Sequence, residues 1–279
     1  QPFIDTRLSF NSYLPKNTTP LIAKKLVNHW IGRLKDNPEL HDKVEFDIAI
    51  TTYSFDIDKK INNLIGDALS PIEKDEFRQL HVEHTKKLIS GNGNGSINCA
   101  LSKLDSLSKK YNNADLVAQK DISNLYSMVD DCVQLGTIPF SILARHGFIA
   151  KTILLSFEQE SILTSAEIYK IQSGVHTVAS ELVDDMRSLN LGRISNSDFM
   201  EKYGHLRPGT YDIKSHRYDQ MSSISTGFIP NHQEEKVKQF ELSDVQRQKI
   251  NQLLEKDGFD PINADNLLKY IHDAIICRE

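Results

Sequence analysis

Apolar residues recur every three or four positions along most of this chain, which is the spacing of one face of an α-helix. Helix starts are also readable, since Ser70 and Glu73, like Ser243 and Gln246, have the spacing of capping boxes. The pattern therefore predicts a mainly α, multi-helix domain. The stripes run through Leu26, Trp30 and Leu34, through Phe77, Leu80 and Leu88, through Leu101, Leu104 and Leu107, through Phe140, Ala144, Phe148 and Leu155, and through Ile168, Ile171, Val175, Val178, Leu182 and Met186.

One segment departs from the helical period. From Val44 the apolar residues alternate at Phe46, Ile48 and Ile50, and the alternation resumes one residue out of phase at Tyr53. Alternation is the pattern of a half-buried strand, and the phase change indicates a bulge. We therefore expect a small β element near residues 43–57, whose partner would be residues 7–13 or a strand outside the chain.

Composition narrows the functional class. The 279 residues carry a formal net charge of −5, which argues against a broad nucleic-acid or anionic-membrane surface. Cys99, Cys132 and Cys277 lie far apart and indicate reduced thiols in a cytoplasmic setting. The longest apolar stretch, near residues 148–157, contains Lys151 and is too short to span a bilayer. We expect a soluble cytoplasmic protein whose partner is a small molecule, not nucleic acid or membrane.

We expect the chain to be part of a longer polypeptide, because it begins at Gln1 without methionine and stops within a helical pattern. The polar stretch 219–241 resembles a linker. We expect residues 1–218 to form a helical acceptor-side domain with the short β segment. Residues 242–279 would then be a C-terminal helical segment that leads to a domain outside the chain.

The run from Tyr203 to Asp212 contains the densest group of candidate residues. Its glycines and proline cost about 1 and 3 kcal/mol in a helix interior, so the run predicts a loop. His205 can donate or accept a proton near neutral pH, and Arg207 can pair bidentately with phosphate or carboxylate. We predict His205 as a catalytic residue, with Arg207 and Tyr211 as substrate-binding residues. The alternative is a structural turn.

Two other pairs of basic residues have simple alternatives. His81 and His84 lie three residues apart on a predicted helix, but no third ligand has recognisable metal spacing. Arg145 and His146 precede Gly147 within a helical pattern, which indicates close helix packing or an anion bound by Arg145. We predict no metal site in the chain.

At the loop, the sequence resembles the superfamily of phosphoenolpyruvate synthase, pyruvate phosphate dikinase and rifampin phosphotransferase. These proteins carry a Tyr-Gly-His-Arg-Gly-Pro-Gly-Glu type loop, and Tyr203, Gly204, His205, Pro208 and Gly209 match it. Leu206 stands in place of the usual Arg, Arg207 in place of a Gly, and Thr210 in place of the Glu. A phosphoenolpyruvate synthase-like branch is also similar over residues 3–12, 37–47 and 136–150, so the resemblance spans most of the chain.

The resemblance implies a multidomain ATP-dependent phosphotransferase. In this superfamily an ATP-grasp domain phosphorylates a histidine on a swivelling domain, and that histidine carries the phosphoryl group to an acceptor. We find neither a phosphohistidine motif nor an ATP-grasp sheet in this chain. It would be the central acceptor-side domain, inactive alone and without a cofactor of its own, while the full-length enzyme would use ATP and Mg.

In that setting His205 would assist the transfer, with Arg207 beside it. Arg7 and Arg145 would be further anion-binding residues, and Tyr211 would line the pocket. The acceptor would be a small molecule, and the other partners would be the ATP-grasp and phosphohistidine domains of the same polypeptide. The alternative is a non-catalytic helical spacer or partner-binding module.

Overall fold

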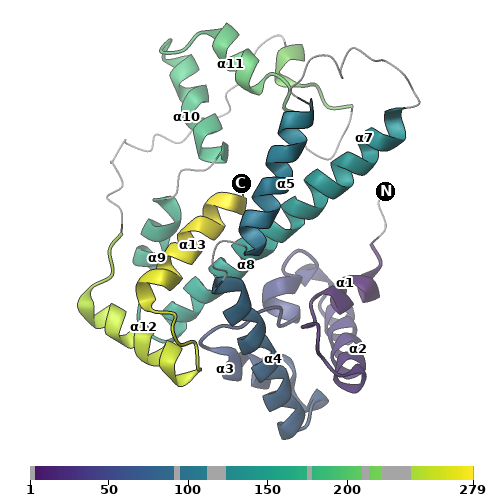
Figure 1. Ribbon diagram of the computed structural model, residues 1–279, viewed down its shortest axis with the longest axis vertical. Coiled ribbons are helices and arrows are strands. Elements are labelled where there is room, and N and C mark those ends of the chain that lie inside the picture. The colour runs from purple at the N-terminus through teal and green to yellow at the C-terminus, as the bar shows by residue number, and fades with distance from the viewer. Residues whose placement is uncertain are drawn as a thin grey trace. The chain divides into compact units, whose positions relative to one another are not determined.

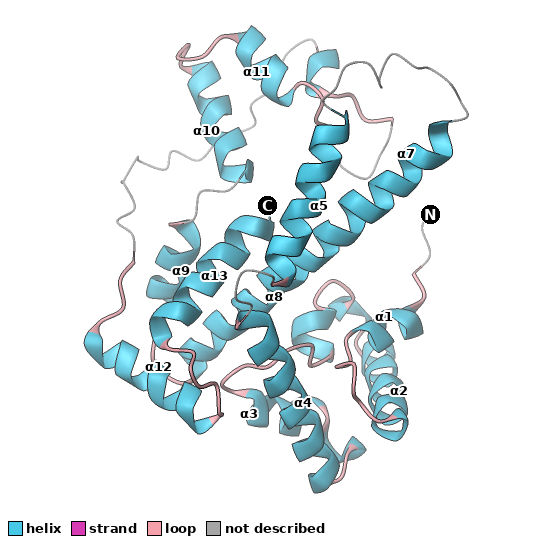
Figure 2. Cartoon of the chain, viewed as in Figure 1, coloured by secondary structure: helices cyan, strands magenta, loops and turns pink. Residues whose placement is uncertain are grey.

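The computed structural model describes residues 4–90, 95–111, 124–174, 178–208, 214–221 and 240–278. These residues are mainly helical, which confirms the predicted fold class, and Figure 2 shows helices and loops but no strand among them. The chain divides into two compact units, residues 1–172 with 240–278 and residues 173–239. We call them unit 1 and unit 2 and describe each by itself.

Unit 1 contains most of the helices (Figure 1). Its elements are α1 (Thr6–Ser12), α2 (Pro20–Asp36), η1 (Pro38–Leu40), η2 (Val44–Ile48), α3 (Ile57–Leu64), η3 (Gly66–Ala68), α4 (Pro71–Ile89), α5 (Ser96–Tyr111), α7 (Leu125–Asp131), η5 (Cys132–Thr137), α8 (Ile138–Gln159), α9 (Ser165–Ser173), α12 (Asp244–Lys256) and α13 (Ala264–Arg278). The predicted caps are present, since the Oγ atoms of Ser70 and Ser243 accept from the N–H groups of Glu73 and Gln246.

The helix α8 is the centre of unit 1. It is the most apolar of the long helices and packs against α5 on one side and α13 on another. Its buried residues join a continuous core that includes Trp30, Phe77 and Phe157. Residues 240–278 therefore pack on α8 as part of unit 1, whereas the sequence pattern set 242–279 apart beyond a linker.

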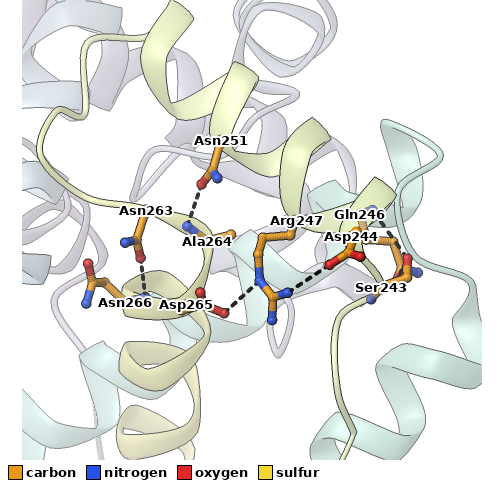
Figure 3. A network of polar contacts seen from close by, with 9 residues as sticks. All are labelled: Ser243, Asp244, Gln246, Arg247, Asn251, Asn263, Ala264, Asp265 and Asn266. Carbon is orange, nitrogen blue, oxygen red and sulfur yellow. Dashed lines mark hydrogen bonds and ion pairs between the residues drawn. The ribbon is translucent and has the colours of Figure 1, made fainter.

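A polar network joins the C-terminal helices α12 and α13 (Figure 3). The Arg247 guanidinium lies 3.0 Å from Asp265 and 3.4 Å from Asp244. The side chain of Asn251 accepts a hydrogen bond from the backbone N–H of Ala264, at the first position of α13. These contacts set the start of α13 and so help to hold its apolar face on α8.

The β element predicted for residues 43–57 is wrong. Residues Val44–Ile48 form a wide helical turn, closed by a 2.9 Å hydrogen bond from Ala49 N–H to Val44 O. The proposed partner, residues 7–13, lies largely in α1. Residues 49–54 are all buried, not alternately buried as in a half-buried strand. Side chains from α8 meet their backbone in place of a neighbouring strand: Arg145 donates to Thr51 O, and Ser156 Oγ accepts from Phe55 N–H.

Unit 2 consists of α10 (Val178–Asn190), α11 (Asn196–Tyr203) and the turn η6 (Tyr218–Gln220). Its small core is aromatic, because Phe199 packs against Tyr203 at 5.0 Å and against Tyr218 at 6.1 Å between ring centroids. The hydroxyl of Tyr203 donates to Asp185 at 2.7 Å and ties α11 to α10. The predicted loop begins directly after α11, within unit 2.

Candidate functional site

Basic residues on one face of α4 and on one face of α8 line the same cavity in unit 1. On α4, His81 and His84 are three residues apart and so share a face. On α8, Arg145 and His146 follow Ile138 and Ile142 at the spacing of one helical face. These faces border a cavity of about 600 Å³. We call it the Arg145 pocket. It is lined by Ser12, Tyr13, Leu14, Pro15, Lys16, Thr51, His81, His84, Leu88, Ser96, Ile138, Ser141, Ile142, Arg145, His146 and Ile149.

Arg145 is a half-buried cation on the pocket wall. Its Nη2 donates to Thr51 O at 3.3 Å, and its guanidinium lies over the Tyr13 ring at 5.3 Å from the centroid. Among the described residues Arg145 has no ion pair within 4.0 Å; the nearby Glu45 carboxylate acts on it electrostatically but accepts its 3.0 Å hydrogen bond from Tyr13 Oη. Burial lowers the pKa of Arg145, but a guanidinium stays protonated at neutral pH. The positive charge therefore lies unpaired beside the cavity.

His81 is buried without a hydrogen bond on either ring nitrogen. It is 1% exposed, and its ring meets Phe77 edge-on at 4.5 Å between centroids. Burial, then the charges of His84 and Arg145, lower the pKa of His81 to about 3, so its imidazole is neutral at pH 7. A neutral imidazole has one donor and one acceptor, and leaving such groups unpaired costs about 1–3 kcal/mol each. This side chain lacks the partners that its chemistry requires.

His146 differs, because both of its nitrogens have partners. Its Nε2 lies 2.7 Å from Ser96 Oγ and its Nδ1 lies 2.8 Å from Tyr270 Oη. Burial, with a smaller contribution from His84, lowers the pKa of His146 to about 4. The His84 side chain, at the exposed rim, has its pKa lowered by burial and then by Arg145 and Lys87. The described lining residues thus include several basic groups but no Asp or Glu.

The predicted residues of the loop lie in unit 2. His205 is exposed and has no hydrogen bond or ion pair among the described residues, while Arg207 Nε donates to Ser215 O at 2.9 Å. Gly204 is required by a close approach, since a Cβ there would collide with Met200 O. Tyr211 lies outside the described residues, as do Gly209, Thr210 and Asp212.

Of the predicted substrate-binding residues that the structure describes, Arg145 alone lines the Arg145 pocket. Arg7 is exposed on α1, where its Nη1 donates to Asn28 Oδ1 at 2.9 Å. The sequence reading singled out His81, His84 and Arg145 but treated them as separate features. It missed Tyr13, Ser96 and Tyr270, which carry no local motif and are brought in by the packing of α1, α5 and α13.

The described residues contain no group of three or more His, Cys, Asp or Glu side chains that could hold a metal ion. One helical stretch, Leu125–Gln159, is long and apolar enough to cross a membrane by length and composition. Half of its apolar window is buried inside the protein, however, and the core helix of a soluble protein has the same properties. No family model matches the chain, and neither a curated protein nor a solved structure matches it.

Proposed function

We propose that unit 1 binds a small organic anion in the Arg145 pocket. The observation that carries this proposal is the combination of an unpaired, half-buried guanidinium at Arg145 with a buried imidazole at His81 that lacks any partner. A carboxylate or phosphate would pair with the first. A hydrogen bond to the second requires its ring to turn toward the cavity, because neither nitrogen is exposed. Hydrogen bonds to charged groups contribute about 1.5–3 kcal/mol each, so the arrangement favours an anionic ligand over a neutral one.

The rest of the pocket narrows the ligand class. Leu14, Leu88, Ile138, Ile142 and Ile149 form an apolar wall beside the basic groups. The volume of about 600 Å³ lies within the usual range for small-molecule sites, about 300–1,000 Å³. The ligand that fits has an anionic head and a compact apolar body, which is the character of a small acceptor molecule more than of a nucleotide.

The sequence resemblance supplies the biochemical setting of this proposal. The chain would be the acceptor-side domain of a cytoplasmic ATP-dependent phosphotransferase of the phosphoenolpyruvate synthase and dikinase type. ATP and Mg would act in the full-length enzyme, and a phosphohistidine domain of the same polypeptide would bring the phosphoryl group. Such a transfer needs positive charge around the phosphoryl oxygens. Arg145 would provide it in the pocket, and His205 and Arg207 would assist the transfer step.

The proposal is tested by calorimetric titration of the chain with pyruvate, phosphoenolpyruvate and inorganic phosphate. We expect at least one of these anions to bind, and Arg145→Gln to weaken its binding by about 10-fold to 100-fold, the equivalent of one charge-assisted hydrogen bond. The matched control is Arg247→Gln, which removes the same charge from the α12–α13 network and should leave the affinity unchanged. Equal affinities for the Arg145 variant and the wild type would contradict the assignment.

A further inference from the structure

Three side chains from three helices form a hydrogen-bonded line at one end of the Arg145 pocket. Ser96 is the first residue of α5, His146 lies in the middle of α8, and Tyr270 lies in α13. Ser96 Oγ is 2.7 Å from His146 Nε2, and His146 Nδ1 is 2.8 Å from Tyr270 Oη. A hydroxyl, an imidazole and a third group that orients the imidazole are the arrangement of an activated serine nucleophile.

The hydroxyl at the open end of this line can meet a ligand. Ser96 is half-buried and lines the Arg145 pocket, and it also lines a second cavity of about 680 Å³ next to α13. His146, in contrast, is 2% exposed and is shielded from water. The serine therefore has access to small molecules, while its hydrogen-bond partner is held in a fixed, dry position.

The His146 imidazole is in the form that can accept a proton, although its lowered pKa makes it a weaker base than an ordinary histidine. Because burial lowers the pKa of His146 to about 4, the imidazole is neutral at pH 7 and retains a lone pair on one nitrogen. Burial also raises the pKa of Tyr270, so this residue keeps its proton. As Ser96 begins a 16-residue helix, the positive end of the α5 dipole lies at the position where negative charge would develop during attack.

We propose that Ser96 is a catalytic nucleophile and that the chain cleaves small carboxylic esters that carry a separate anionic group. In this assignment His146 has its proton on Nδ1, donated to Tyr270 Oη, and its Nε2 accepts the proton of Ser96. Tyr270 is a positioning residue. Only the preference for an anionic ester rests on the proposed function, through Arg145, since the activation of Ser96 does not need an anion.

The chemistry balances with water as the second substrate. Ser96 Oγ forms a bond to the ester carbonyl carbon as its proton passes to His146 Nε2. The ester C–O bond then breaks, and the leaving alkoxide takes that proton from His146. Water repeats the sequence on the acyl-serine, giving the free acid and restoring Ser96.

The first test treats the full chain with an alkyl fluorophosphonate, which loses fluoride on attack by an activated serine, and maps the adduct by mass spectrometry. We expect the label on Ser96 and its loss in Ser96→Ala. Ser141→Ala is the matched control, because Ser141 lines the same pocket but donates to Thr137 O at 2.9 Å. Absence of the label from Ser96 in the wild-type chain overturns the proposal.

The second test compares hydrolysis of the 4-nitrophenyl esters of succinate, which is anionic, and butyrate, which is neutral. Tyr270→Phe keeps the ring but removes the hydroxyl, so we expect it to lower kcat about 10-fold or more with KM unchanged. Arg145→Gln should abolish the preference for the anionic ester, whereas Arg247→Gln, outside the pocket, should leave both the preference and the fluorophosphonate adduct on Ser96 unchanged. Failure of the anion preference alone would count against the proposed function, whereas hydrolysis unchanged in Ser96→Ala would overturn the nucleophile.

Discussion

At the scale of single residues, His81 couples the stability of unit 1 to pH. Its pKa is about 3 in the folded chain, below the ordinary value near 6.5, so between these values the unfolded chain binds a proton that the folded chain does not. Stability therefore falls as the pH decreases from about 6.5 toward 3, by about 1.4 kcal/mol per pH unit for this group. We predict that His81→Leu removes this contribution and flattens the acid limb of the stability profile.

The measurement is urea unfolding at several pH values between 7 and 4, followed by the fluorescence of Trp30. This residue is the only tryptophan and is fully buried in unit 1. His41→Leu replaces an exposed histidine and serves as the control, with an unchanged slope. At pH 7 His81→Leu should be at least as stable as the wild type, since it removes two unpaired nitrogens, yet bind anions more weakly. A pH slope equal to that of the wild type would contradict the prediction.

The candidate site was only partly predictable from these residues. The sequence marked both helices as candidates for a binding site. The marks were the spacing of His81 and His84 and the unusual Arg145-His146-Gly147 run. A helical period tells which residues share a face of one helix, but not which two faces meet. The placement of α4 and α8 around one cavity depends on long-range packing, and it turned two ambiguous motifs into one basic pocket whose described lining contains no carboxylate.

At the scale of elements, the contact between α8 and α13 holds the site together, because it positions Tyr270 against His146. Ala274 is fully buried in this part of the core, where interiors have no room for additional methylene groups. We predict that Ala274→Leu destabilises unit 1 by about 1–3 kcal/mol through overpacking. Ile276→Leu, at an exposed position of the same helix, should change the free energy of unfolding by less than about 0.5 kcal/mol.

Thermal unfolding followed by circular dichroism would measure both variants. If Ala274→Leu were as stable as the wild type, α13 would have to shift on α8 to make room. The distance between His146 and Tyr270 would then change as well, and the ester hydrolysis described above would be the more sensitive readout.

Elements that depend on residues close together in the sequence were predictable. Elements that depend on contacts between distant segments were not. The caps at Ser70 and Ser243 need only residues three positions apart, so the sequence predicted both. The alternation after Val44 correctly marked Ile48 and Ile50 as buried, but burial does not require a strand. Here Arg145 and Ser156 satisfy the backbone that a neighbouring strand would have paired, and no local pattern reveals such partners.

At the scale of the whole molecule, all the described lining residues of the Arg145 pocket belong to unit 1, and His205 and Arg207 belong to unit 2. Unit 1 is built from both ends of the chain, since Leu242, Ile250 and Ile271 belong to the same core as Trp30. A core that is continuous across such distant segments should fold without the segment between them. Anion binding by unit 1 would then not require unit 2.

We therefore predict that a variant with residues 173–239 replaced by a flexible Gly/Ser linker of about 20 residues keeps the fold and the anion affinity of unit 1. Such a linker spans about 25 Å on average and imposes little structure. A variant that lacks residues 240–279 should instead lose the cooperative transition of Trp30, because it exposes the face of α8 that α13 covers. Titration of the linker variant with the anion that binds best decides the role of the loop. Unchanged affinity shows that anion binding needs only unit 1, whereas a loss of about 10-fold or more would contradict this prediction.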